Sequence, residues 1–222
     1  MIVERARGAE LAADARIERT WLRLSQAVLS LAAERDIATV SVAELSRRAG
    51  IHRATFYDHA ETPVALLTRV LAIDLDAVRV RSMTQLDRAG LLLRDLTRTT
   101  MAEIIDHVLT HEGVYGGAGR ASSLYALRVV LAEHVEQSVL TVLREGFAIP
   151  PTPGPDAARL HAAFIAHGIT GAVEAWLRLP RPRDPDLLLA AVEASYPAWY
   201  APPAADPEVR PGPILNSSTG ET

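Results

Sequence analysis

Apolar residues recur at every third or fourth position along almost the whole chain, and this helical spacing limits the fold more than any other feature of the sequence. Strict alternation of apolar and polar residues, which is typical of half-buried strands, does not occur. Ala and Leu are abundant and aromatic residues make up only 5% of the chain, which favours helix over sheet. We therefore predict an all-α protein. The first clear apolar stripe consists of Ile17, Trp21, Leu24, Ala27, Val28, Leu31 and Ala32.

Capping and helix-breaking residues divide this pattern into elements. Ser41 stands three residues before Glu44, the spacing of a capping box, and Thr62-Pro63 combines an N-cap with a proline at the first helical position. Helices are predicted over 16–35, 42–48, 52–58, 63–81, 86–111, 121–145, 156–179 and 184–196. The predicted organisation is a flexible arm (1–15), a small N-terminal unit (16–61), a larger helical unit (62–200) that begins with a linking helix (62–81), and a disordered tail (201–222).

Composition excludes several classes of protein. The chain contains no Cys, which excludes disulfides and thiol catalysis, and no apolar run approaches the ~18 residues of a membrane span. The charged N-terminus does not resemble a secretory signal. All 23 basic residues are Arg, which suits contacts with phosphates and guanine edges but is equally explained by codon preference. We expect a soluble cytoplasmic protein with no membrane partner, no metal and no cofactor.

The two short predicted helices at residues 42–58 have the spacing of a helix-turn-helix. Gly50 permits the positive φ that the tight turn requires, and the small Ser46 stands where the helices cross. The second helix presents side chains suited to a DNA major groove, because Arg can bind guanine with two hydrogen bonds while Tyr and His donate to phosphates. A generic helical hairpin with a charged face is the alternative. The candidate DNA-contacting residues of this helix are His52, Arg53, Thr55, Tyr57 and His59.

The segment V-A-E-L-S-R-R-A-G-I-H-R-A-T-F-Y-D-H, preceded by a helix that starts near Arg19-Thr20, resembles the DNA-binding head of TetR-type (tetracycline-repressor-like) transcriptional regulators. The resemblance is strong over residues 16–72; beyond them, helix order and the segment A-F-I-A-H-G-I-T-G-A-V-E-A-W-L are also similar. It implies an N-terminal three-helix head, a linking helix, and a larger helical ligand-binding and dimerisation domain. It further implies a homodimer that binds a near-palindromic operator and a small-molecule effector.

The resemblance also implies roles for individual residues of the head. Arg53 and Thr55 occupy positions of base-edge or adjacent phosphate contacts, and Tyr57 and His59 occupy positions that bind phosphates. Ser41 and Thr62, each at the start of a helix, are further candidates for phosphate contacts. The sequence departs from the family pattern at three places. His52 replaces the usual Ser or Asn cap, Ala60 replaces the usual Phe, and Thr62-Pro63 lacks the usual Lys.

The charge of the head is nearly balanced, since residues 1–60 contain nine Arg and eight acidic residues, a net charge of +1. Affinity for DNA must therefore come from local placement of Arg and from dimerisation more than from bulk charge. We expect a modest dependence on salt concentration.

Two C-terminal helices are candidates for the dimer interface. Residues 162–179 alternate small and large side chains, and small residues at helical spacing allow a second helix to approach closely. Together with 184–196, this segment is predicted to form a four-helix interface between two chains; an ordinary core within one chain is the alternative. The candidate interface residues are Phe164, Gly168, Gly171, Ala172, Trp176, Leu188 and Val192.

The helices between head and interface are expected to surround an apolar cavity for the effector, although the same residues are also consistent with a plain core. The candidate lining residues are Met101, Ile104, His107, Val108, His111, Tyr125, Arg128 and His134. His107 and His111 stand four apart on one helix with Glu103 a turn earlier, a spacing compatible with metal ligands, but the sequence identifies no third ligand.

No enzyme motif accompanies these features, since GxSxG, P-loop, dinucleotide-binding and HExxH patterns are all missing. The function predicted from sequence is a homodimeric DNA-binding transcriptional regulator, a repressor that a small molecule releases from its operator. Two alternatives remain open: a constitutive or architectural DNA binder without an effector, and a helical dimer whose head contacts proteins.

Overall fold

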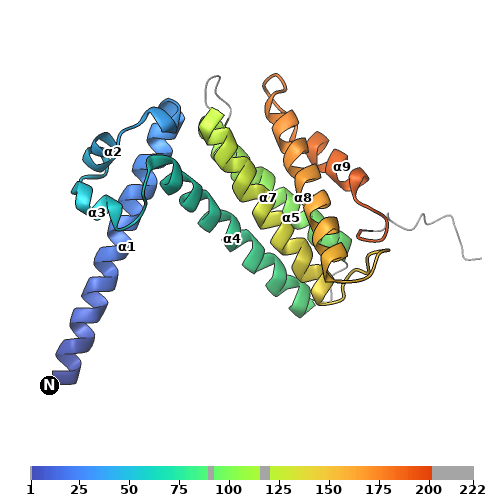
Figure 1. The fold of residues 1–222 in the computed structure, drawn as a ribbon, viewed down its shortest axis with the longest axis horizontal. Coiled ribbons are helices and arrows are strands. Elements are labelled where there is room, and N and C mark those ends of the chain that lie inside the picture. Colours follow the sequence, from blue (N-terminus) through green and yellow to red (C-terminus); the bar gives the residue numbers. More distant parts are fainter. Residues whose placement is uncertain (1, 90–92, 116–120, 202–222) are drawn as a thin grey trace, which may run out of the picture.

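The protein is helical throughout the part of the chain that the computed structural model describes, residues 2–89, 93–115 and 121–201, and no strand occurs there. The all-α prediction is confirmed. The N-terminal head contains α1 (Ile2–Glu34), a short 3-10 turn (Ile37–Thr39), α2 (Val42–Ala49) and α3 (Arg53–Tyr57). Figure 1 shows the head at one end of α4 (Pro63–Ala89), which leads into the larger helical unit. The predicted disordered tail lies outside the described residues, apart from Ala201.

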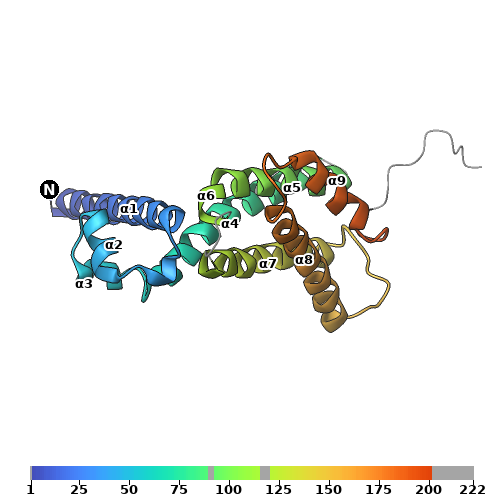
Figure 2. The same ribbon diagram turned by 90° about the horizontal axis from the view of Figure 1, so that it is seen from above.

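The larger unit is built from α5 (Leu93–Thr110), the short α6 (Glu112–Tyr115), α7 (Ala121–Arg144), α8 (Pro155–Leu177) and α9 (Pro185–Ser195). Within it, α7 packs against both α4 and α8, while α9 packs against α5 and α8. Seen from above, in Figure 2, α8 and α9 lie at the side of this unit away from the head. The segment after α9 folds back onto the core, because Tyr200 and Ala201 are buried.

Several helix boundaries differ from those predicted. α1 continues back to Ile2, where the sequence indicated a flexible arm, and its first turns are rich in the strong helix formers Ala, Glu and Arg. α4 continues from the predicted end at Arg81 to Ala89, since no Gly or Pro interrupts it before Gly90. Beyond the predicted end of the helix 86–111, Glu112–Tyr115 forms the further short helix α6, and residues 116–120 lie outside the described chain.

The head contacts the larger unit directly as well as through α4. A Cβ added to Gly113 of α6 would lie 3.3 Å from the Cβ of Ala33 in α1, so a larger residue there would press the two helices apart. Asp36 accepts hydrogen bonds from the backbone N–H of Ala38 (2.9 Å) and of Ser122 at the start of α7 (3.3 Å). These bonds hold the pKa of the Asp36 carboxyl below its usual value, against the opposing effect of burial. Two helices of the larger unit are thereby joined to the end of α1.

Candidate DNA-binding surface and ligand cavity

The turn between α2 and α3 has the geometry that the sequence predicts. Gly50 has φ 64° and ψ 39°, a left-handed conformation that favours glycine, and it ends α2. Leu45, Phe56 and the small Ser46 are buried where the two helices meet. Because Phe56 is completely buried, this side chain fixes the short α3 to the head, and the next residue, Tyr57, is exposed.

α3 presents an exposed surface with one guanidinium at its N-terminal end. His52, Arg53 and Tyr57 are exposed, and Thr55 is half-buried. The ring of Tyr57 meets the buried ring of Phe56 edge to face, with centroids 5.6 Å apart, which limits the directions that the phenol can take. Arg53 and Tyr57, four residues apart, lie on one face of α3 and are open to solvent, whereas Thr55 is partly covered by the head.

Arg53 differs from several other arginines of the head in having no partner within the described chain. Arg35 pairs with Glu44, and Arg48 forms two hydrogen bonds with Glu34 (2.8 and 3.1 Å). No ion pair or side-chain hydrogen bond joins Arg53 to another described residue. Its five N–H donors are therefore free to bind an external acceptor.

Two predicted phosphate-contacting residues are helix caps. The hydroxyl of Ser41 accepts the N–H of Glu44 (3.2 Å) at the start of α2, and that of Thr62 accepts the N–H of Ala65 (3.1 Å) at the start of α4. The capping box at Ser41 is only half formed, because the Glu44 carboxylate binds Arg35 instead of returning to the cap. His52 makes no capping hydrogen bond with its side chain, as the departure from the family pattern suggested.

His59 lies deeper in the head than the sequence indicates. It is half-buried, its ring centroid lies 6.2 Å from that of Trp21, and its backbone carbonyl accepts a hydrogen bond from Arg69 of α4 (2.8 Å). The Arg69 guanidinium in turn lies 4.9 Å from the Trp21 ring centre. The contacts among Trp21, His59 and Arg69 therefore connect α1, the residues that follow α3, and the linking helix α4.

The candidate dimer residues separate into two groups. Phe164 is 76% exposed, and Gly168 and Gly171 are also exposed on α8. Trp176 and Leu188 are instead buried within the chain, so their assignment to a chain–chain interface needs correction. Val192 is also buried, but it lines a groove beside Phe164. Trp176 donates its indole N–H to the carbonyl of Asp184 (2.9 Å), which ties the end of α8 to the start of α9. Ala172, half-buried, lies between the two groups.

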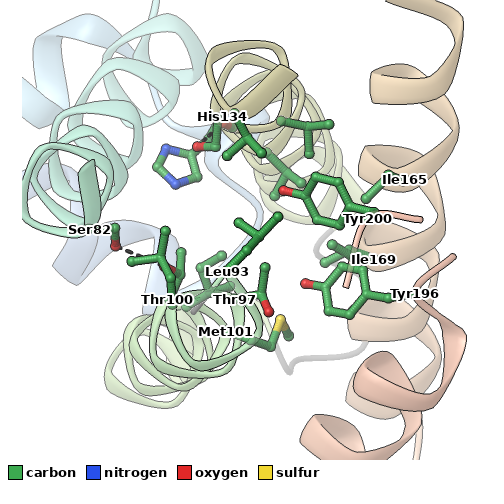
Figure 3. A pocket seen from close by; sticks show the side chains of 16 residues that line it. Ser82, Leu93, Thr97, Thr100, Met101, His134, Ile165, Ile169, Tyr196 and Tyr200 are labelled. Atoms are coloured by element: carbon green, nitrogen blue, oxygen red, sulfur yellow. Dashed lines mark hydrogen bonds between the residues drawn. The ribbon is translucent and has the colours of Figure 1, made fainter. Parts of the chain in front are cut away.

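A small cavity of about 40 Å³ lies among α4, α5, α7, α8 and the segment after α9 (Figure 3). Three of the eight predicted lining residues do line this cavity: Met101, Ile104 and His134. The sequence analysis missed its other polar groups. These are Ser138 and, as Figure 3 shows around the same space, Ser82, Thr97, Thr100, Tyr196 and Tyr200. Ser82 and Thr100 are already joined by a hydrogen bond of 2.8 Å. The sequence signal for the two tyrosines was their spacing of four residues, which would place them on one side of a helix. They lie after the end of α9, however, so helical periodicity alone does not predict that they line a cavity.

The other five predicted lining residues lie elsewhere. Tyr125 is 64% exposed on α7. Arg128 binds the buried carboxylate of Glu174 on α8, with Nη2 2.6 Å from Oε2, and this pairing lowers the pKa of Glu174. Val108 is packed in the core, while His107 and His111 line a separate groove between α4 and α5. Helical periodicity placed all five on the correct helices but could not assign each face to cavity, groove or solvent.

His134 is the most unusual polar group of the cavity. Both of its ring nitrogens are buried without a hydrogen-bond partner among the described residues. Burial, reinforced by the positive charge of Arg79, lowers the pKa of His134 to about 4. The imidazole is therefore neutral at pH 7 and offers one donor and one acceptor inside a largely apolar space.

Acid should destabilise the protein through His134. Between pH 6.5 and 4 the unfolded chain binds a proton at this residue and the folded chain does not, so the free energy of unfolding falls as the pH is lowered through that window. The loss should be about 2–3 kcal/mol. Urea unfolding at neutral and acidic pH measures it. His134→Leu should lose less stability on acidification than the wild type. An equal loss in the wild type and His134→Leu would contradict the assignment.

No helix among the described residues has the length and apolar character needed to cross a membrane.

Comparison of the sequence with protein-family models and with curated proteins gives no match. Solved structures do match over most of the chain. FadR from Thermus thermophilus, a TetR-family transcriptional repressor in complex with lauroyl-CoA, is 13% identical, with 87% of this chain and 99% of that chain covered and a TM-score of 0.58.

Two further structures agree. A TetR-family regulator from Syntrophomonas wolfei is 15% identical over 80% of this chain and 92% of its own, with a TM-score of 0.57. RolR in complex with resorcinol is 18% identical over 82% of this chain and 89% of its own, with a TM-score of 0.52. In each of these comparisons, the matched part of this chain includes residues of both the head and the larger helical unit. The chain therefore has the fold of the TetR-type transcriptional regulators.

Proposed function

We propose that this protein is a homodimeric transcriptional regulator that binds a near-palindromic operator through α3 and is released from it by a small molecule, as a repressor. The observation that carries the proposal is the exposed Arg53 without a partner in the described chain, beside Tyr57, on a helix anchored by Phe56. Ser41 and Thr62 begin the two neighbouring helices, whose N-termini favour phosphate oxygens. Arg53 and Thr55 would read bases, and Tyr57, His52 and His59 would contact the backbone.

A selection from random-sequence DNA tests this function and identifies the operator in the same experiment. Duplexes retained by the purified protein should become enriched in one near-palindromic sequence, because two identical heads read two related half-sites. Retention of DNA without enrichment of any sequence would contradict a sequence-specific regulator and support an architectural binder.

The second copy is proposed to pack on α8. Phe164 and Leu160 are 76% and 74% exposed, and the exposed Gly168 and Gly171 would allow a partner helix to approach closely. A groove beside them is lined by Phe164, Ala172 and Tyr196. A large exposed aromatic side chain next to an apolar groove and small residues is typical of an interface rather than of a solvated face.

Phe164→Asp should therefore convert the dimer to a monomer, because it places a charge in an apolar interface. Sedimentation equilibrium measures the change, and operator affinity at low protein concentration should fall with it. Tyr125→Asp is the matched control, since Tyr125 is also an exposed aromatic residue but lies on α7. A Phe164→Asp protein that remains dimeric would contradict the α8 interface.

Resorcinol and lauroyl-CoA are bound by two proteins of the same fold. For this chain, we propose that the effector enters the cavity that contains His134, which offers hydrogen bonds with no partner in the described chain. At about 40 Å³ the cavity is much smaller than ordinary ligand pockets, so the effector would have to favour a conformation in which it is enlarged.

The small cavity also favours a second candidate, a DNA-binding regulator without an effector. A thermal-shift screen of small molecules separates the two. Ligands that stabilise the wild type but not His134→Leu support the effector-responsive regulator; a screen without any such ligand supports the constitutive one.

A further inference from the structure

We propose that Asp74, His107 and His111 form a binding site for one transition-metal ion of the Zn²⁺ type. Asp74 belongs to the linking helix α4, and the two histidines lie one turn apart on α5. Each residue offers one ligand atom, and these atoms all lie within 4.8 Å of one another. The fold thus supplies the third ligand that the sequence did not identify.

Glu103, the acidic residue one turn before His107 on α5, is not the third ligand. Glu103 is held by Arg81, whose Nη2 lies 2.7 Å from its Oε2. Asp74 approaches instead from α4, with Oδ2 3.4 Å from Nε2 of His111. Two ligands of a tetrahedral ion with bonds of about 2.0–2.1 Å lie roughly 3.4 Å apart, so this pair already has the spacing that a shared ion requires.

Neighbouring side chains hold the imidazole of His107 in place. His107 is buried, its ring centroid lies 4.7 Å from that of His111, and its Nε2 lies 3.3 Å from the hydroxyl of the buried Tyr115. Contacts of this kind fix the orientation of metal-binding imidazoles. Small rotations about the side-chain bonds would bring the three ligand atoms around one ion.

Access and ligand chemistry indicate the kind of ion. The three residues line a groove between α4 and α5 that is open to solvent, with Asp106 on its rim. Two imidazoles and one carboxylate suit Zn²⁺, Co²⁺ or Ni²⁺, whereas Mg²⁺ and Ca²⁺ prefer oxygen ligands throughout. Three protein ligands leave a fourth position for water.

The site would join the helix that carries the head to α5 of the larger unit. An ion bound there would hold α4 and α5 together at the level of Asp74, about three turns along the linking helix. The metal site stands independently of the proposed DNA binding, because occupancy can be measured on the free protein.

Metal titration of the full chain without an affinity tag, after treatment with a chelator, tests the proposal. Calorimetry with Zn²⁺ and absorption spectroscopy with Co²⁺ should give saturable binding of one ion per chain. Asp74→Asn and His111→Gln, both at sites that solvent reaches, should each weaken binding by roughly tenfold or more, since even the loss of a supporting contact around a metal ligand costs roughly 10–100-fold.

Two matched variants serve as controls. Asp76→Asn changes an exposed carboxylate two residues along α4, and His52→Gln changes an exposed histidine in the head, at the start of α3. Both should bind Zn²⁺ like the wild type. Absence of saturable binding by the wild type, or equal affinity in Asp74→Asn, His111→Gln and the controls, would overturn the site and leave Asp74 and His111 as a close contact between α4 and α5.

Discussion

Replacing Arg53 with Ala should reduce affinity for the specific operator by roughly 2–6 kcal/mol, because each of two heads loses a contact worth about 1–3 kcal/mol. The effect is expected because no described residue pairs with Arg53, so its donors are available for a bidentate contact with a base. Affinity for unrelated DNA should change much less, since base contacts rather than bulk charge are lost.

The comparison is made by fluorescence anisotropy on specific and unrelated duplexes. Arg144→Ala is the matched control, because it removes the same charge from an exposed position at the end of α7, outside the head. Equal affinities of Arg53→Ala and Arg144→Ala for the specific duplex would show that α3 does not read the operator.

Replacing Phe56 with Ala should destabilise the head by about 3–5 kcal/mol, the usual consequence of removing a large aromatic side chain from a core. Phe56 is completely buried and is the main anchor of α3, which has only five residues and cannot be stable as an isolated helix. The head should open locally while the larger unit, with its own core, remains folded.

Hydrogen exchange measures this local opening. Amides of α2 and α3 should exchange much faster in Phe56→Ala, whereas those of α7 and α8 should keep their protection. Tyr57→Ala provides the control, because it removes the adjacent aromatic ring from a side chain that is 60% exposed. Unchanged protection of α2 and α3 in Phe56→Ala would mean that α3 is held by something other than this side chain.

The head was predictable because the signals that form it are local. Ser41 caps α2, Gly50 takes the left-handed conformation, and Phe56 fills the space between the helices, all within sixteen residues. Local capping and turn residues act through backbone geometry that any tertiary context must respect. The extension of α1 to Ile2 was missed because the first residues lack a clear apolar stripe, although their helix propensity is high.

The sites of the larger unit were less predictable because they depend on contacts between distant segments. Trp176 and Phe164 lie on the same helix and look equivalent in sequence, yet one is buried and the other is 76% exposed. Glu174 reads as a surface residue, but Arg128, 46 residues earlier in the chain, allows it to be buried. His107 and His111 gained their third partner from Asp74, more than thirty residues away, which no local pattern identifies.

Binding of the wild-type protein to DNA is the most direct test of the proposed function. The measurement is anisotropy of a labelled duplex from upstream of the protein's own coding sequence, titrated at two salt concentrations, with the stoichiometry determined at saturation. The proposed function predicts saturable binding of two chains per site, with affinity that falls modestly as salt increases. Weak, unsaturable binding that is the same for an unrelated duplex, at both salt concentrations, would contradict it.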